Sequence, residues 1–461
     1  GDILIGTRSS GLFYLRRTPF RSYDSNSGLH GEAVNSVAEF PAKQFWIASD
    51  NGLYCLKGNR FVSNKITEIL SGVRIKHLQE SGNKLYISTI GLGVVVWDGI
   101  EIDYINAENG LENLVVKKTL VDSQERLWVS TSGGITLFRG DTRVALYNKD
   151  SGFLSDEIYD IYEDSQQRIW VCTVEDGLLR FEKNGSYQRF SSREGLNGEM
   201  VFSVREDQQG DFWVNTASGT FLIRRDDSIY PVPVEIGLPY SYVYNALPHE
   251  TTIYFTSVKG FSVADLKETK RAVLGKTESF EPVLYDWNNG LAASPNALSW
   301  LFIDSGNNVW IPTHRGVTCY YPSRKRKNET PLNIHIQRIE ADKKIIVPSE
   351  TPLTLYSNPG RLTIRFTVPT LRGGNQIRYR YFMEGYDATW TEHSSAGTAV
   401  FTQPGYGNYT FHVEAQSPRG DTIDRAGFDI RIQRPVTPYL LIPVVLLIIL
   451  ITAAAVLYIK R

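Results

Sequence analysis

The sequence predicts an all-β chain: a seven-bladed β-propeller, then an immunoglobulin-like β-sandwich, then one C-terminal transmembrane helix. Three observations support this prediction. An aromatic residue recurs with a period near forty over the first two thirds of the chain. Short alternating strands follow over about one hundred residues, and an uncharged apolar run ends the sequence.

The repeat is anchored by a Trp or Tyr in a short apolar strand. Successive anchors are 40 to 43 residues apart, except for a last step of 56. The clearest unit, residues 153–190, holds four short strands separated by polar or glycine-containing turns, which is typical of a propeller blade. The anchors are Trp46, Tyr86, Trp128, Trp170, Trp213, Tyr254 and Trp310, with a weaker copy at Leu4.

The number of innermost strands predicts how the ring closes. Seven segments read as innermost strands, so we expect a seven-bladed ring over residues 30–322. Residues 1–24 supply three more strands without an innermost partner and are predicted to be the remnant of a preceding blade, in a chain that starts inside a longer protein. The innermost strands are expected near 34–39, 75–79, 115–121, 157–163, 200–206, 243–247 and 298–303.

An aspartate stands six residues before four of the anchors. Asp side chains accept backbone N–H groups in tight turns, so we expect these residues to close the hairpin that leads into the anchor strand. The anchor tryptophans are expected to be buried between blades. The four aspartates are Asp122, Asp164, Asp207 and Asp304.

Composition excludes several kinds of function. With 49 basic and 50 acidic residues the formal charge is −1, which gives no reason to expect direct nucleic-acid binding. The one basic run, 324–327, is interpreted as part of a solvated linker over residues 323–330. The three cysteines, Cys55, Cys172 and Cys319, have no metal-type spacing, and neither a disulfide, a metal nor a cofactor is predicted.

The last third of the chain predicts a sandwich and a membrane anchor. Residues 331–434 contain short alternating strands with regular turn signals, as immunoglobulin-like sandwiches do. Residues 439–459 are 21 positions without a charge, enough for a helix to cross the ~30 Å hydrocarbon core. Because Lys460 and Arg461 follow, the C-terminus is expected in the cytoplasm and the residues before about 438 in the periplasm, with the helix in the inner membrane.

Two motifs carry a resemblance to a known family. IRYRYFMEGYDATW, with Tyr379 and Tyr381, and PGYGNYTFHVEA, with Tyr409, resemble the triple-tyrosine domain of bacterial propeller-type sensors. The repeats, with RIWVCTVEDGLLRF and recurring Gly-Leu pairs, resemble the regulator propeller repeats of the same proteins. In this order the domains resemble the periplasmic sensor region of a hybrid two-component system of the Bacteroidetes type. Such proteins carry two propellers and a cytoplasmic histidine kinase, and this chain contains one propeller and no such output domain.

The resemblance implies a sensor function. We expect the propeller region to bind a glycan-derived oligosaccharide, and a homodimer to transmit the signal to an output that regulates transcription of polysaccharide-utilisation genes. A non-catalytic scaffold or interaction module is the alternative, and a propeller glycosidase or lyase is the third reading. Glycosidases need two carboxyl groups about 5–9.5 Å apart, whereas the repeated aspartates are spread around the ring, so no catalytic residue is predicted.

The long last step of the repeat predicts where a ligand could bind. It implies an insertion of about 14 residues, and long loops on rigid scaffolds concentrate function. An aromatic face with amide and guanidinium donors suits a sugar, so Trp287, Asn288, His314 and Arg315 are the candidate ligand-binding residues. The other reading, at least as well founded, is that the insertion only contacts a neighbouring domain.

Overall fold

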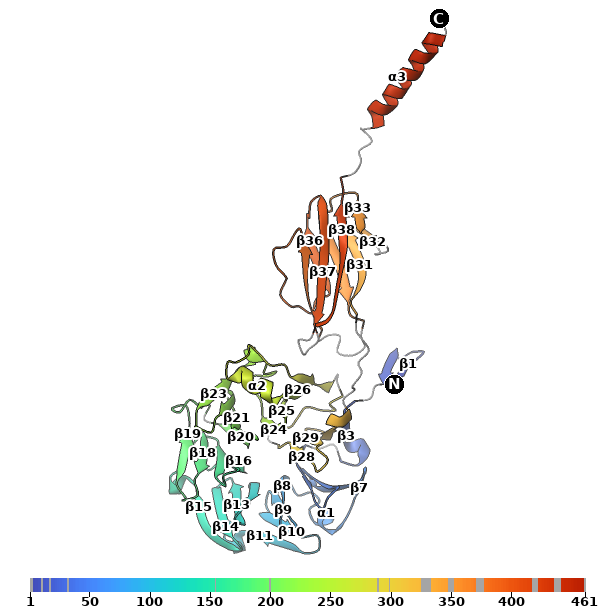
Figure 1. The fold of residues 1–461 in the computed structure, drawn as a ribbon. Coiled ribbons are helices and arrows are strands. Elements are labelled where there is room, and N and C mark those ends of the chain that lie inside the picture. Colours follow the sequence, from blue (N-terminus) through green and yellow to red (C-terminus); the bar gives the residue numbers. More distant parts are fainter. Residues whose placement is uncertain are drawn as a thin grey trace. The chain divides into compact units, whose positions relative to one another are not determined.

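The computed structural model divides the chain into two compact units, residues 1–327 and residues 328–461 (Figure 1). The division falls inside the predicted basic linker. The structure describes residues 3–9, 11–15, 18–30, 33–153, 155–198, 200–287, 290–297, 299–324, 333–346, 352–369, 377–416, 422–434 and 441–459. Each unit is considered by itself.

Seven four-stranded antiparallel sheets form the first unit within its described residues. Each sheet runs from an innermost to an outermost strand, and neighbouring innermost strands contact one another around the ring. The predicted all-β class and its propeller are confirmed. The first six sheets are β4 (Val34–Glu39), β5 (Gln44–Ser49), β6 (Gly52–Lys57) and β7 (Arg60–Val62); β8 (Ile75–Ser81), β9 (Lys84–Thr89), β10 (Val94–Trp97) and β11 (Ile102–Ile105); β12 (Val116–Val121), β13 (Arg126–Thr131), β14 (Gly134–Arg139) and β15 (Thr142–Tyr147); β16 (Ile158–Glu163), β17 (Ile169–Thr173), β18 (Leu178–Phe181) and β19 (Tyr187–Phe190); β20 (Val201–Glu206), β21 (Phe212–Thr216), β22 (Gly219–Ile223) and β23 (Ile229–Val232); and β24 (Asn245–His249), β25 (Thr252–Ser257), β26 (Gly260–Asp265) and β27 (Val283–Tyr285).

The seventh sheet corrects the expectation for residues 1–24. It consists of β28 (Phe302–Ile303), β29 (Val309–Thr313), β30 (Gly316–Tyr320) and, as its outermost strand, β3 (Phe20–Tyr23) from the start of the chain. Phe20 pairs with Tyr320, and both rings are buried. The seven innermost strands were predicted correctly, but β3 was assigned to a preceding blade, whereas it completes the last blade of the ring. Only β1 (Ile3–Gly6) and β2 (Leu12–Leu15) pair apart from the ring.

The repeated aspartates close the hairpins as predicted and also fix the anchors. Asp164 Oδ1 accepts the backbone N–H groups of Gln166 and Arg168, while Oδ2 accepts the indole N–H of Trp170 at 2.8 Å. The Arg168 guanidinium binds the same oxygen at 2.6 Å. Asp122 and Asp304 repeat the backbone and indole bonds. Each carboxylate therefore binds three groups of its blade: the backbone of the turn, a guanidinium or amide side chain, and the buried indole.

The fifth blade obtains its cation from elsewhere. Its turn has Asp211 where the third and fourth blades have Arg126 and Arg168 and the seventh has Asn308. Lys270 Nζ lies 2.9 Å from Asp207 and 2.5 Å from Asp211. Lys270 belongs to α2 (Leu266–Val273), which buries Leu266 and Ala272 in the same hydrophobic cluster as Trp213. The extra residues of the long repeat step thus lie mainly between β26 and β27, before Trp287, and not around it as expected.

A second repeated contact joins neighbouring blades. Glu163 accepts the backbone N–H and the hydroxyl of Ser123 in the preceding blade, at 2.8 and 2.6 Å. Glu206 accepts the same two groups of Ser165. Glu39 of the first blade holds Ser305 of the last at 2.8 Å, so the same contact also closes the ring.

The Gly-Leu pairs end short turns between blades. Gly110 adopts a left-handed φ of 85° after η2 (Ala107–Asn109). Glycine tolerates this backbone conformation, whereas a residue with a side chain would be strained there. Leu111 then inserts into the core with no exposure. Among the described residues of this unit, the other short helices are η1 (Ser25–Ser27), η3 (Lys149–Ser151), η4 (Val234–Ile236), η6 (Pro322–Arg324) and α1 (Lys65–Ile69).

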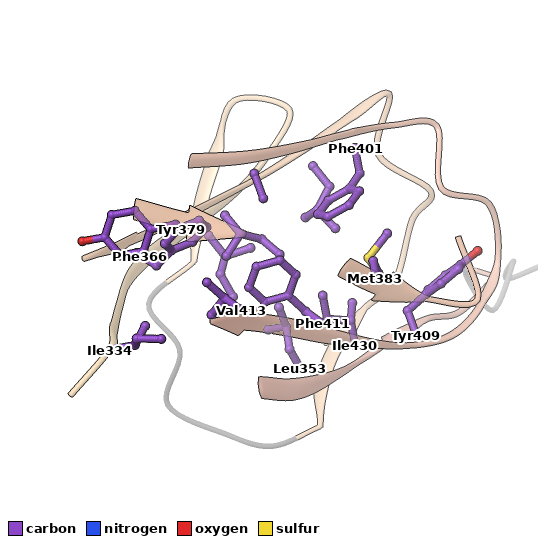
Figure 2. Packing of buried hydrophobic residues seen from close by; sticks show 14 of the residues in the cluster. Ile334, Leu353, Phe366, Tyr379, Met383, Phe401, Tyr409, Phe411, Val413 and Ile430 are labelled. Atoms are coloured by element: carbon purple, nitrogen blue, oxygen red, sulfur yellow. The ribbon is translucent and has the colours of Figure 1, made fainter. Parts of the chain in front are cut away.

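The second unit is a sandwich of two four-stranded sheets. One sheet is ordered β32-β31-β34-β36 and the other β33-β38-β37-β35, and a single hydrophobic cluster contains residues of both (Figure 2). Tyr379 and Tyr409 are buried there, and the Tyr409 hydroxyl donates to the carbonyl of Pro404, five residues upstream, as in a tyrosine corner. The strands are β31 (His335–Ala341), β32 (Lys344–Ile346), β33 (Leu353–Leu355), β34 (Arg361–Thr367), β35 (Arg378–Glu384), β36 (Thr398–Thr402), β37 (Gly407–Gln416) and β38 (Thr422–Ile432).

The chain ends in the helix α3 (Leu441–Ile459), within the segment predicted to cross a membrane. Among the residues that the structure describes, no helix meets the combined length and hydropathy expected of a membrane span.

Removing β3 should open the seventh blade. We expect a chain that starts at residue 25 to unfold at a clearly lower temperature, because β30 loses its partner strand and Phe20, a buried aromatic worth about 3–5 kcal/mol, is lost. A chain that starts at residue 16 lacks only β1 and β2 and is the matched control. Thermal unfolding followed by circular dichroism measures both; equal midpoints for the two truncations would show that β3 does not close the ring.

Candidate functional site

Five innermost strands share a β-bulge at the same place. The register of each shifts at its second residue, between Val34 and Ser36 in the first blade and at the equivalent pair in the next four. A bulge leaves one residue out of the ladder and re-aims its side chain, and bulges are frequent beside binding sites. The extra residues are Asn35, Lys76, Lys117, Tyr159 and Phe202.

Four of these bulge residues line a cavity of about 260 Å³ at one end of the central channel. The cavity lies where the innermost strands begin, since its wall also contains the residues just before or at the start of β12, β16 and β24. Tyr159, Phe202 and Tyr244 follow one another around it, with ring centroids 5.8 and 6.1 Å apart. Trp300 completes the aromatic lining, and we call this space the mouth cavity.

Charged and polar groups also line the mouth cavity. Arg74 and Lys76 both bind Asp50, at 2.9 and 3.3 Å. Burial raises the pKa of Asp50, but hydrogen bonds from Asn35 and Arg74 outweigh it and hold that pKa below its usual value. Burial lowers the pKa of Lys117, and the charge of Lys76 lowers it further. The cavity therefore combines aromatic faces with ammonium and guanidinium donors.

The channel continues into a second cavity of about 420 Å³, lined by later residues of the same strands. Its wall contains His77 of β8, Lys118 of β12 and Arg205 of β20. Asp160 of β16 is fully buried between the two cations: Lys118 Nζ binds one carboxylate oxygen, and an Arg205 nitrogen lies 2.6 Å from the other. We call this space the channel cavity.

His77 lies between the two cavities. The rings of His77 and Trp300 are nearly perpendicular, with centroids 4.9 Å apart, and the Lys118 ammonium lies 5.0 Å from the centre of the same indole. Burial lowers the pKa of His77 well below its ordinary value, and the charges of Lys118 and Arg205 lower it further. Within the described part of the chain, its Nδ1 atom is buried without a hydrogen-bond partner.

The candidate residues from the sequence lie elsewhere. Trp287 is 79% exposed, and His314 and Arg315 are exposed in the turn between β29 and β30. None of these three lines the mouth cavity, and Asn288 lies outside the described residues. Their role in binding stays a prediction. Trp300, Ser299 and Ala297 of the same connection do reach the cavity.

The bulge residues were missed because a bulge is not visible as a break in the hydrophobic pattern. A signal was nevertheless present: the second position of each innermost strand is polar, charged or aromatic in five consecutive repeats, beside a Val or Ile. Aligning the repeats by their anchors would have brought these five positions into one column.

The fold is that of a propeller module followed by a sandwich. Comparisons with known proteins agree with this class. Residues 152–175 match the two-component regulator propeller and residues 371–433 match the Y_Y_Y domain. The resemblance predicted from the sequence, to the sensor regions of hybrid two-component systems, is thereby confirmed. No curated protein sequence matches the chain.

Two solved structures show the same fold at low sequence identity. The extracellular domain of one hybrid two-component system from B. thetaiotaomicron superposes with a TM-score of 0.78 at 18% identity, covering 94% of this chain and 60% of that one. A second such extracellular domain from B. thetaiotaomicron gives a TM-score of 0.56 at 16% identity, covering 95% and 61%. This chain therefore spans about three fifths of the length of these relatives.

The buried His77 should make stability depend on pH. Below the unfolded pKa of 6.5 the unfolded chain takes up a proton that folded His77 resists, so stability should fall as the pH falls, by at most about 1.4 kcal/mol per unit. We expect His77→Phe, which keeps a ring against Trp300, to flatten the melting temperature between pH 6.5 and 5.

The matched control is His335→Phe, at an exposed position of the second unit. Thermal unfolding across this pH range measures both variants. A slope in His77→Phe as steep as in the unchanged protein would assign the pH dependence to other groups.

Proposed function

We propose that this chain is the extracytoplasmic sensor region of a membrane receptor and that it binds an oligosaccharide in the mouth cavity. The carrying observation is the set of bulge residues that turns Lys76, Lys117, Tyr159 and Phe202 toward one end of the channel. Ligand sites are concave, mostly apolar, and furnished with a few placed polar groups. This cavity has that composition.

The chemistry of the lining favours a sugar. Half-buried aromatic faces at Tyr159, Phe202 and Tyr244 complement the apolar faces of sugar rings. The side chains of Asn245 and Ser299 border the same space, and Lys117 provides a donor for hydroxyl groups. The volume of about 260 Å³ suits one or two sugar units of a longer ligand, with the remainder over the rim.

The repeated aspartates give no support to a glycosidase. Asp122, Asp164 and Asp304 are buried, and each carboxylate is occupied by backbone N–H groups and an indole. None of them lines the mouth cavity. Within the described residues no group of three His, Cys, Asp or Glu side chains is placed to hold a metal ion. A scaffold function remains the alternative, and ligand binding distinguishes the two.

The rest of the sensor proposal extends the resemblance. The uncharged segment 439–459 would anchor the chain in the inner membrane, with the propeller and the sandwich in the periplasm. A cytoplasmic output, which we propose to be a histidine kinase that regulates transcription of polysaccharide-utilisation genes, would lie beyond Arg461. A single membrane helix has no second conformation that could transmit a signal. A homodimer would therefore carry the signal, because its two copies can adopt two relative arrangements for which the ligand has different affinities.

Ligand binding tests the site. Oligosaccharides from bacterial growth substrates are screened by calorimetry against the purified chain, and we expect one of them to bind. Tyr159→Ala and Phe202→Ala should each lower the affinity for it at least tenfold, because each variant removes a stacking contact. Tyr104→Ala, on the outermost strand β11, is the matched control with 40% exposure and should bind normally. An equal loss of affinity in all three variants, or an unchanged affinity in both cavity variants, would show that the ligand does not bind in the mouth cavity.

Crosslinking tests the dimer. With Cys55, Cys172 and Cys319 replaced by Ala, a cysteine introduced at Leu441 should crosslink between two copies in membranes, with a yield that changes when the oligosaccharide is added. The same substitution at exposed Tyr104 is the control for random collisions. A Leu441→Cys yield equal to that control, with and without ligand, would contradict a signalling dimer.

A further inference from the structure

The channel cavity contains more positive than negative buried charge. Lys118 and Arg205 have side chains only 7% and 15% exposed, and both bind the one carboxylate of Asp160, whose side chain is fully buried. A guanidinium stays protonated in proteins, so Arg205 balances Asp160 and the Lys118 ammonium is left in excess. An uncompensated buried charge costs several kcal/mol.

Among the described residues, neither of the other two acids that line this cavity forms an ion pair with Lys118. Glu80 is exposed to solvent, and Glu39 accepts the backbone N–H and hydroxyl of Ser305 in the last blade. The pKa of Lys118 is lowered by burial and by Arg205, although Asp160 opposes this, which shows how poorly the site solvates the ammonium.

A third polar side chain, that of His77, lines the same cavity. His77 is only 8% exposed, and its Nδ1 atom has no hydrogen-bond partner among the described residues. A buried ring nitrogen without a hydrogen bond is costly, and a neutral imidazole can donate from this atom. His77, Lys118 and Arg205 therefore present three donor groups from three blades to one cavity of about 420 Å³.

We propose that the channel cavity binds an oxyanion group, a carboxylate or a sulfate, between His77, Lys118 and Arg205. The anion neutralises the excess charge and accepts the hydrogen bond of His77, and charge-assisted bonds of this kind are strong. The residues differ from those of the mouth cavity, so this site does not depend on the oligosaccharide proposal. The oxyanion is either a free ion or an acidic sugar, and the experiment separates these sources.

Calorimetry on the 461-residue chain provides the test, with sodium sulfate, glucuronate and neutral glucose titrated separately at fixed ionic strength. We expect sulfate or glucuronate to bind and glucose to leave the channel cavity untouched. Binding of sulfate identifies a free ion as sufficient, whereas binding of glucuronate alone assigns the oxyanion to a sugar. No binding of either anion would overturn the proposal.

Variants assign the site. Lys118→Met leaves the neutral Arg205 and Asp160 pair, so it should lose anion binding by at least a hundredfold and melt no lower than the unchanged protein in anion-poor buffer. His77→Phe keeps the charges, removes one donor and should weaken binding about tenfold, and it serves if Lys118→Met fails to fold. Lys149→Met removes an exposed lysine and should bind anions normally. Equal anion affinity in Lys118→Met, His77→Phe and Lys149→Met would show diffuse surface binding and refute the site.

Discussion

The buried carboxylate that precedes the anchor strand in four of the seven blades is the interaction on which those blades depend. One oxygen of Asp164 holds the turn through two backbone N–H groups, and the other holds the indole of Trp170. A carboxylate taken out of water is costly unless its lone pairs are satisfied, and here both oxygens are used. The ring position, the turn geometry and the strand register are therefore fixed together. Where the local cation is missing, in the fifth blade, the helix α2 supplies Lys270 instead.

The repeat predicted much of this arrangement. The period, the anchors and the preceding aspartates determine a blade because each blade repeats one solution to burying an indole, and that solution is local in sequence. Ring closure is not local: β3 pairs with β30 across almost the whole propeller sequence, and its own four residues read like the end of any blade. Only the pairing partner shows that Phe20 and Tyr23 belong to the seventh blade. The sequence pattern could not supply that partner.

The candidate site was harder to predict for a related reason. Trp287, His314 and Arg315 were selected because loop residues on a rigid scaffold often bind ligands, yet the aromatic and basic lining of the mouth cavity comes largely from strands. A bulge at the second residue of β8, β12, β16 and β20 exchanges one ladder bond for a side chain directed at the channel. Regular alternation assigns such a residue to the wrong face of the sheet, so the pattern that identifies the strands conceals the site.

Closure by β3 also has a mechanical consequence. The strand that enters the propeller, β3, is hydrogen-bonded to the strand that leaves it, β30, so the entrance and the exit of this unit are adjacent in one sheet. Because Phe20 lies directly opposite Tyr320, the incoming and outgoing chain leave this pair of strands at the same end. Tension between them therefore peels the strands apart from that end, toward Tyr23 and Val317, before it reaches the other six blades. The ring is therefore connected to the rest of the chain through one pair of strands. A displacement upstream of the propeller can reach the segment after it through this pair, without deforming the channel.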